Sequence, residues 1–114
     1  MVEQVEATTQ DVIAVAEFRS ALRHFLRRSE KIARQSGLTP QRYTLLMMIK
    51  GAPDGAEQST VTELAERMQL AQSTVTELVR RAESAGLIER EQSQRDARVA
   101  HLRLTPEGDR RLML

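Results

Sequence analysis

The sequence contains no cysteine and very few aromatic residues. Without cysteine, the chain has no disulfide bond, no thiol nucleophile and no thiol redox sensor. Aromatic residues make up 3% of the chain, which leaves few rings on which unpaired nucleic-acid bases could stack. No apolar run is long enough to cross a bilayer, and the N-terminal stretch MVEQVEATTQ lacks the apolar core of a signal peptide. We therefore expect a cytoplasmic protein with no membrane segment.

The sequence also lacks an excess of charge of one sign. Its 114 residues carry a formal net charge of +1, and 40% of them are hydrophobic and 29% charged. This composition is typical of a soluble globular protein, and the length fits one domain with one core. Any affinity for a polyanion must therefore come from local basic patches.

The N-terminal part of the chain predicts a flexible segment followed by one long helix. Residues 1–10 are polar and are expected to be flexible. Over residues 11–36 apolar side chains recur with helical spacing, and basic side chains occupy the opposite face. We expect the apolar face to pack in the core; it consists of Val15, Phe18, Leu22, Phe25, Leu26, Ile32 and Ala33.

Two shorter helices are predicted from their start signals. Thr39-Pro40 supplies an N-cap and a proline at the first helical position, and this helix stops at Gly51. Thr60 and Glu63 have the spacing of a capping box, which begins the next helix. The glycines and the proline of GAPDGAEQ predict a loop between the two helices.

A helix and a hairpin follow, and they define the expected fold. After a break at residues 69–71, QSTVTELVRRAESAG has an apolar stripe at helical spacing and ends at Gly86. Residues 87–91 and 99–105 then predict two strands joined by a charged loop. A helix-turn-helix followed directly by a hairpin predicts a winged helix-turn-helix, a mainly α fold with a small β-wing (α+β). Thr105-Pro106 begins a final helix.

The solvent face of the helix after the break suits the major groove of DNA. Its hydroxyls can bond phosphates or bases, Arg80 can bridge guanine acceptors, and Glu77 can accept from cytosine. Free N–H groups at the start of the helix can hold a phosphate. The alternative is an ordinary solvated helix face. The predicted DNA-binding residues on this helix are Gln72, Ser73, Thr74, Thr76, Glu77 and Arg80.

The loop in SQRDARVAHLRLT places Asp96 among three arginines, Arg95, Arg98 and Arg103. Aspartate stabilises tight turns by accepting from nearby backbone N–H groups, so Asp96 is predicted to organise the tip. An arginine is attracted to the negative potential of a narrow minor groove, so Arg98 or Arg95 is predicted to contact DNA there. The alternative is a charged tip that only keeps the protein soluble.

With these helix and loop patterns, the chain resembles the MarR family of bacterial transcription regulators. The similarity rests on Ser-Thr-Val at residues 73–75, Gly-Leu-Ile at residues 86–88, Asp-x-Arg in the loop, and Leu-Thr-x-x-Gly at residues 104–108. The sequence LTPQRYTLL also stands where the family has its second helix. The resemblance covers nearly the whole chain.

The resemblance implies a homodimer that binds pseudo-palindromic double-stranded DNA, usually as a repressor released by a small-molecule effector. It assigns residues 11–36 to a dimerisation helix, 38–105 to the DNA-binding lobe and 106–114 to the start of a C-terminal dimerisation helix, which is truncated in this sequence. It carries DNA contacts over to Ser73, Thr74, Thr76, Arg80, Asp96 and Arg98. Glu77 departs from the family, which often has a basic residue at that position.

Enzymatic and metal chemistry have no supporting motif. There is no Gly-rich phosphate loop, and His24 and His101 lie far apart with no cysteine to complete a metal site. We therefore expect no catalytic residue, no metal and no cofactor. An alternative function is a winged-helix module that binds protein rather than DNA. Four arginines argue against it, since DNA binding needs a local basic face: Arg80, Arg81, Arg95 and Arg98.

Overall fold

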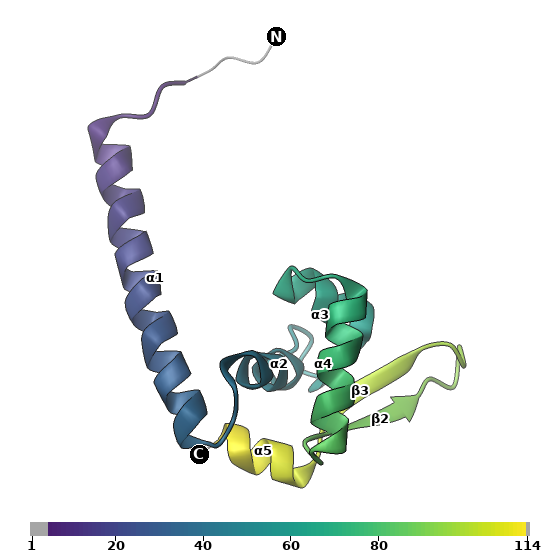
Figure 1. Cartoon of the computed structure of the whole chain (residues 1–114). Coiled ribbons are helices and arrows are strands. Elements are labelled where there is room, and N and C mark those ends of the chain that lie inside the picture. The colour runs from purple at the N-terminus through teal and green to yellow at the C-terminus, as the bar shows by residue number, and fades with distance from the viewer. Residues whose placement is uncertain (1–4, 114) are drawn as a thin grey trace.

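One long helix, α1 (Thr9–Gln35), projects from a small lobe that contains the other elements (Figure 1). The structure, a computed structural model, describes residues 5–113. Along the lobe the elements are α2 (Pro40–Lys50), β1 (Gln58–Ser59), α3 (Val61–Met68), α4 (Gln72–Ser84), β2 (Ile88–Gln92), β3 (Ala100–Leu104) and α5 (Pro106–Leu112). The predicted winged helix-turn-helix, mainly helical with a small β-wing, is confirmed. Among the helices within residues 5–113, none is both long and apolar enough to cross a membrane.

Side-chain caps mark the starts of α1, α2 and α3. Thr39 Oγ1 accepts from the backbone N–H of Arg42 at the start of α2, and Thr60 and Glu63 form the expected capping box of α3. α1 has a capping box of its own, since Thr8 Oγ1 accepts from Asp11 N (3.2 Å) and Thr8 N donates to Asp11 Oδ2 (2.9 Å). Because of this box, α1 begins at Thr9 rather than at residue 11 as predicted. The prediction used the spacing of apolar residues, which does not reveal a polar cap.

The sheet has three antiparallel strands in the order β1-β3-β2. Ser59 pairs with Leu102, and Ile88 and Gln92 pair with Leu104 and Ala100 at the two ends of the β2–β3 hairpin. β1 lies at the end of the segment GAPDGAEQ and in the residue after it, where we predicted only a loop. A strand of two residues is too short to produce an alternating pattern.

The core lies between the helices of the lobe and the inner face of the sheet. Side chains from α2, α3, α4 and β3 have no exposed surface or almost none: Leu45, Leu46, Ile49, Leu64, Val75, Val79 and Leu102. This packing fixes the rotation of α4 about its own axis. The opposite face of α4 is therefore held toward solvent.

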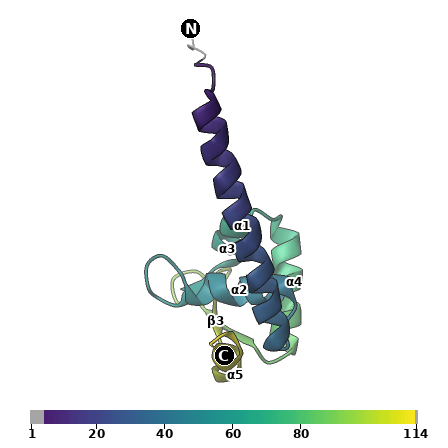
Figure 2. The ribbon, with the colours of Figure 1, turned by 90° about the vertical axis from the view of Figure 1, so that its left-hand side faces the viewer.

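The apolar face of α1 does not pack in this core, contrary to our expectation. Val15, Phe18, Leu22 and Phe25 are 53%, 67%, 40% and 59% exposed. Ala33 is the buried residue of α1, because the helix meets α2 only near its C-terminal end and then extends away from the lobe (Figure 2). Periodicity reports which face of a helix is apolar, but not what covers that face.

The wing and α5 meet at a tight backbone junction. Thr105 Oγ1 donates to Gly86 O (2.6 Å) and accepts from Gly108 N (3.0 Å), while Thr105 N donates to Leu87 O (3.0 Å). Gly108 lies so close to the backbone of Leu87 that a Cβ on Gly108 would be 2.1 Å from Leu87 O. The Gly-Leu-Ile and Leu-Thr-x-x-Gly motifs thus form one structural unit.

Candidate nucleic-acid interface

The N-terminal end of α4 is exposed and has free backbone donors. Ala71 is its N-cap and supplies no side-chain hydrogen bond, so the first N–H groups of α4 remain available to an anion. Gln72 makes a long contact from Nε2 to Thr62 Oγ1 of α3 (3.5 Å). Five of the predicted site residues are exposed on this helix, namely Gln72, Ser73, Thr74, Thr76 and Arg80.

Glu77 and Arg80, predicted as two separate base contacts, bind each other. Arg80 donates from Nε to Glu77 Oε2 (3.0 Å) and from Nη2 to Glu77 Oε1 (2.6 Å). Arg81 donates from Nε to the same Oε1 (3.1 Å). These hydrogen bonds, that of Arg80 first, lower the pKa of Glu77 to about 2. Glu77 is therefore ionised at neutral pH and holds two arginines on the exposed face of α4.

The wing tip is organised by Ser93 and Asp96. Ser93 Oγ accepts from the backbone N–H groups of Arg95 (3.2 Å) and Asp96 (3.4 Å). Asp96 Oδ1 accepts from the backbone N of Arg98 (3.0 Å) and from its Nε (3.2 Å), and Oδ2 accepts from Nη2 (3.3 Å). The side-chain and backbone bonds from Arg98 lower the pKa of Asp96. The side chain of Arg98 is 91% exposed, so Asp96 orients a guanidinium that otherwise faces solvent.

Of the other two arginines, Arg103 lies elsewhere on the hairpin. It pairs with Glu89 (3.1 Å) and Glu91 (3.1 Å) of β2, because the strand register places Arg103 opposite Glu89, away from the tip. The expectation that Arg103 lies near Asp96 at the wing tip is therefore wrong. Arg95 is exposed in the loop, and no ion pair within residues 5–113 includes it.

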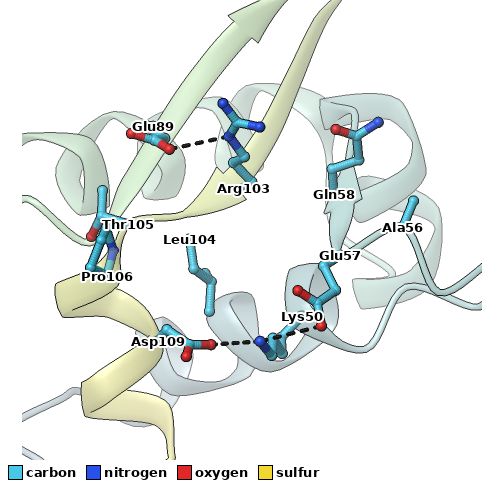
Figure 3. Close-up of a pocket in the computed structure, with 10 residues that line it drawn as sticks. All are labelled: Lys50, Ala56, Glu57, Gln58, Glu89, Arg103, Leu104, Thr105, Pro106 and Asp109. Carbon is cyan, nitrogen blue, oxygen red and sulfur yellow. Dashed lines mark hydrogen bonds and ion pairs between the residues drawn. The ribbon is translucent and has the colours of Figure 1, made fainter.

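A cavity of about 450 Å³ lies away from this surface, between the sheet, α2 and α5 (Figure 3). Lys50 Nζ lies 2.7 Å from Asp109 Oδ1 and 3.3 Å from Glu57 Oε1, and these bonds raise the pKa of Lys50. The lysine therefore ties α2 to α5 and to the segment before β1. A smaller cavity of about 240 Å³ lies between α1 and α2, with Leu26 and Tyr43 in its lining. Within residues 5–113 no group of three His or acidic side chains could hold a metal.

A helix pair that exposes the second helix, followed by a hairpin with an ordered basic tip, defines a winged helix-turn-helix protein. The model of the MarR family matches residues 36–99 of the chain. The chain belongs to this family.

Solved structures of MarR proteins share the fold. A MarR family protein from Bacillus stearothermophilus is 28% identical with a TM-score of 0.74, over 95% of this chain and 73% of that one. The transcriptional regulator MOSR of M. tuberculosis, solved in complex with DNA, is 28% identical with a TM-score of 0.63, over 88% and 69%. A regulator from Streptomyces coelicolor, also solved with DNA, shares 23% identity and the fold, with a TM-score of 0.72 over 97% and 69%. No curated protein sequence matches the chain significantly.

Sequence reasoning missed two contributors to this surface. Arg81 was assigned no contact of its own, although Glu77 and Arg81 have the i,i+4 spacing at which helical charges pair. Ser93 was treated only as the start of the loop, although a serine commonly accepts from backbone N–H groups two and three residues later. Both signals were present in the sequence.

Proposed function

We propose that the chain is a transcription regulator that binds double-stranded DNA through α4 and the β2–β3 wing. The observation that carries this proposal is the arginine of the wing, Arg98, held in an ordered and exposed position by Asp96. A solubilising tip needs no such order, because exposed ion pairs contribute only about 0–1 kcal/mol to stability. Membership of the MarR family and the DNA complexes of two structural neighbours support the same function.

Each predicted site residue has a role in this proposal. The exposed start of α4 holds a backbone phosphate through free N–H groups and hydroxyls, with Gln72, Ser73 and Thr74. Thr76 and Arg80 face the bases of the major groove, with Arg80 on guanine. Glu77 holds Arg80 through its carboxylate. Arg98 enters the adjacent minor groove, and Arg95 binds a phosphate at its edge.

We further propose that two copies associate through α1. The exposed apolar residues Val15, Phe18, Leu22 and Phe25 follow the 3-4-3 spacing of a helix–helix seam. A second copy offers the same seam, so a two-fold contact covers both faces at once. Two recognition helices then reach half-sites about one helical turn apart on a pseudo-palindromic operator. In this arrangement α1 is the dimerisation helix and residues 38–105 form the DNA-binding lobe.

The cavity between α1 and α2 is where we place a small apolar effector. It lies where the proposed dimer helix meets the lobe. An occupant there would change the angle between α1 and the lobe, and with it the spacing of the two recognition helices. A ligand that binds better to the arrangement in which the spacing of the recognition helices does not match the operator would release the DNA. Repression relieved by such a ligand is the mode of action that we propose.

Binding should be to duplex DNA and should weaken steeply as salt rises. Neutralised phosphates release counterions, so log Kobs should fall linearly with log salt concentration. A single-stranded oligonucleotide should compete poorly, because the chain has only 3% aromatic residues for base stacking. Fluorescence anisotropy with a labelled duplex, selected from a randomised library, measures both effects. Binding that is independent of salt, or a preference for the single strand, would rule out the proposed function.

The wing offers a prediction with an informative sign. Arg98→Ala should weaken binding of the selected duplex by about 1–3 kcal/mol. Asp96→Asn removes a negative charge that phosphates repel, so electrostatics alone predicts tighter binding. Because Asp96 positions Arg98 through both carboxylate oxygens, we expect Asp96→Asn to bind more weakly.

Glu89→Gln is the matched control for this sign. It removes one negative charge from the same hairpin, but at Arg103 rather than at the tip. Glu89→Gln should bind as tightly as the parent or more tightly. If Asp96→Asn behaves like Glu89→Gln in parallel titrations at one salt concentration, Asp96 does not position Arg98.

A further inference from the structure

The chain contains the same ion-pair arrangement twice, once on α4 and once on α5. Both helices carry the pattern Glu-x-x-Arg-Arg. On α5, Arg110 donates from Nε (2.9 Å) and Nη2 (2.6 Å) to the two oxygens of Glu107, and Arg111 donates from Nε (2.9 Å) to Oε1. The distances on α4 agree within 0.2 Å, with 3.0, 2.6 and 3.1 Å. We call this arrangement, in which one glutamate accepts from two arginines three and four residues later, a clamp. Because it recurs on two helices, helical spacing alone is enough to form it.

The two clamps differ in what surrounds them. The α5 clamp is part of the scaffold, because Arg111 also donates to Ser36 O after α1 (3.3 Å). The α4 clamp stands on the exposed face that carries Ser73 and Thr76. A clamp on the proposed recognition surface acts on DNA, whereas a clamp in the scaffold does not.

The clamp on α4 leaves a defined part of Arg80 free. Glu77 occupies the Nε and Nη2 side of the guanidinium. The side formed by Nη1 and the second Nη2 hydrogen is directed away from the carboxylate. Those parallel donors match the O6 and N7 acceptors of guanine. A free arginine would instead sample many rotamers and bind whichever phosphate lies within reach.

We propose, on the premise that α4 enters the major groove, that Glu77 is a specificity-determining positioning residue. It holds Arg80 by one side so that the other faces guanine, and it keeps Arg81 away from the phosphates. Its negative charge also weakens attachment to arbitrary DNA, because nearby phosphates repel it at every sequence. Specificity is the difference between the affinity for the operator and the affinity for arbitrary DNA. Glu77 raises the first by positioning Arg80 and lowers the second by its negative charge.

Glu77→Gln is the direct test. Against poly(dA-dT), an arbitrary duplex without the O6 and N7 acceptor pair of guanine, we expect this variant to bind several-fold more tightly than the parent at low salt. Against the best duplex selected from a randomised library with the parent chain, we expect no such gain. The ratio of the two affinities should fall at least about 10-fold, the size of one lost bidentate base contact. A thermal melt checks that the fold is intact.

Glu107→Gln is the matched control, since it removes the same charge from the same type of clamp on α5. It should leave the affinity ratio within about two-fold of the parent value, because non-specific electrostatic effects act on both duplexes. Glu77→Asp tests whether the negative charge is enough or whether the length of the side chain is also needed. It keeps the negative charge but shortens the side chain, so it should lose specificity as Glu77→Gln does. An affinity ratio for Glu77→Asp equal to that of the parent would mean that charge suffices.

A double-mutant cycle with Arg80→Ala decides whether Glu77 acts through Arg80. If it does, Glu77→Gln should change the affinity ratio much less in the Arg80→Ala background. An unchanged effect there would overturn the proposal and would favour direct reading of cytosine by Glu77. An unchanged ratio in Glu77→Gln itself would also overturn it. In both cases the parent still binds duplex DNA, whereas failure of the proposed function would abolish that binding in the parent.

Discussion

Gly108→Ala should lower the free energy of unfolding by about 3 kcal/mol, at the upper end of the usual cost of overpacking. A Cβ at this position would lie 2.1 Å from Leu87 O and 3.0 Å from Leu87 C. Both atoms belong to the backbone, so no change of rotamer relieves the overlap. α5 would have to move away from the wing, which strains the bonds of Thr105 to Gly86 and Leu87.

The sign of the expected change in the free energy of unfolding distinguishes this prediction from one based on helix propensity. Inside a helix alanine is favoured over glycine by about 1 kcal/mol, and Gly108 lies inside α5. Propensity alone thus predicts that Gly108→Ala stabilises the protein. Urea denaturation followed by circular dichroism measures the change as a shift of the midpoint.

Gly55→Ala is a useful control. Gly55 has a positive φ of +74°, and nothing lies within 4 Å of an added Cβ. It should cost only about 1–2 kcal/mol, the strain of a left-handed backbone without an overlap. A Gly108→Ala protein as stable as the parent would show that the junction is loose and that Gly108 is not needed for close approach.

The elements that the sequence predicted well are those specified by local chemistry. Thr39 and Thr60 correctly predicted the starts of their helices. The hydroxyl that caps a helix is close in sequence to the N–H groups from which it accepts. The stripe of Val75 and Val79 correctly predicted the buried side of α4. The exposed face follows from that stripe by helical geometry, so the amino-acid pattern alone is enough to predict the location of the candidate interface.

The relations between distant parts of the chain were harder to predict. Arg103 was assigned to the wing tip because it is close to Asp96 in sequence, but strand register places it beside Glu89. The acceptors of Thr105, which explain its place in the motif, lie across the junction at Gly86 and Leu87. Pairings of this kind depend on register and docking, which composition and periodicity do not encode.

The face of α1 shows a third kind of limit. The sequence correctly identified an apolar face, but the single chain leaves Phe18 and Phe25 more than half exposed. An apolar seam of this size on a helix that projects from its lobe is typical of an interaction surface. The error was to assume that the core of the lobe covers this face.

Phe18→Asp should therefore abolish dimerisation while leaving the lobe folded. Phe18 is 67% exposed in the projecting part of α1, so the substitution removes no contact of the core. In the proposed dimer it would place an unpaired carboxylate within an apolar seam, which costs several kcal/mol. We expect the parent chain to dimerise at micromolar concentrations and Phe18→Asp to sediment as a monomer.

The effect on DNA should be larger for two half-sites than for one. Linking two binding modules raises the overall affinity by roughly 10²–10⁴ over a single module. Phe18→Asp should therefore lose about 100-fold or more on the selected two-half-site duplex and almost nothing on a single half-site. Ser20→Asp is the matched control, because it adds the same charge to the same helix two residues further on, where the side chain points to the opposite face. Ser20→Asp should sediment and bind as the parent does. A parent chain that is monomeric at high micromolar concentration, or a Phe18→Asp variant that still dimerises, would show that the apolar face of α1 is not the interface.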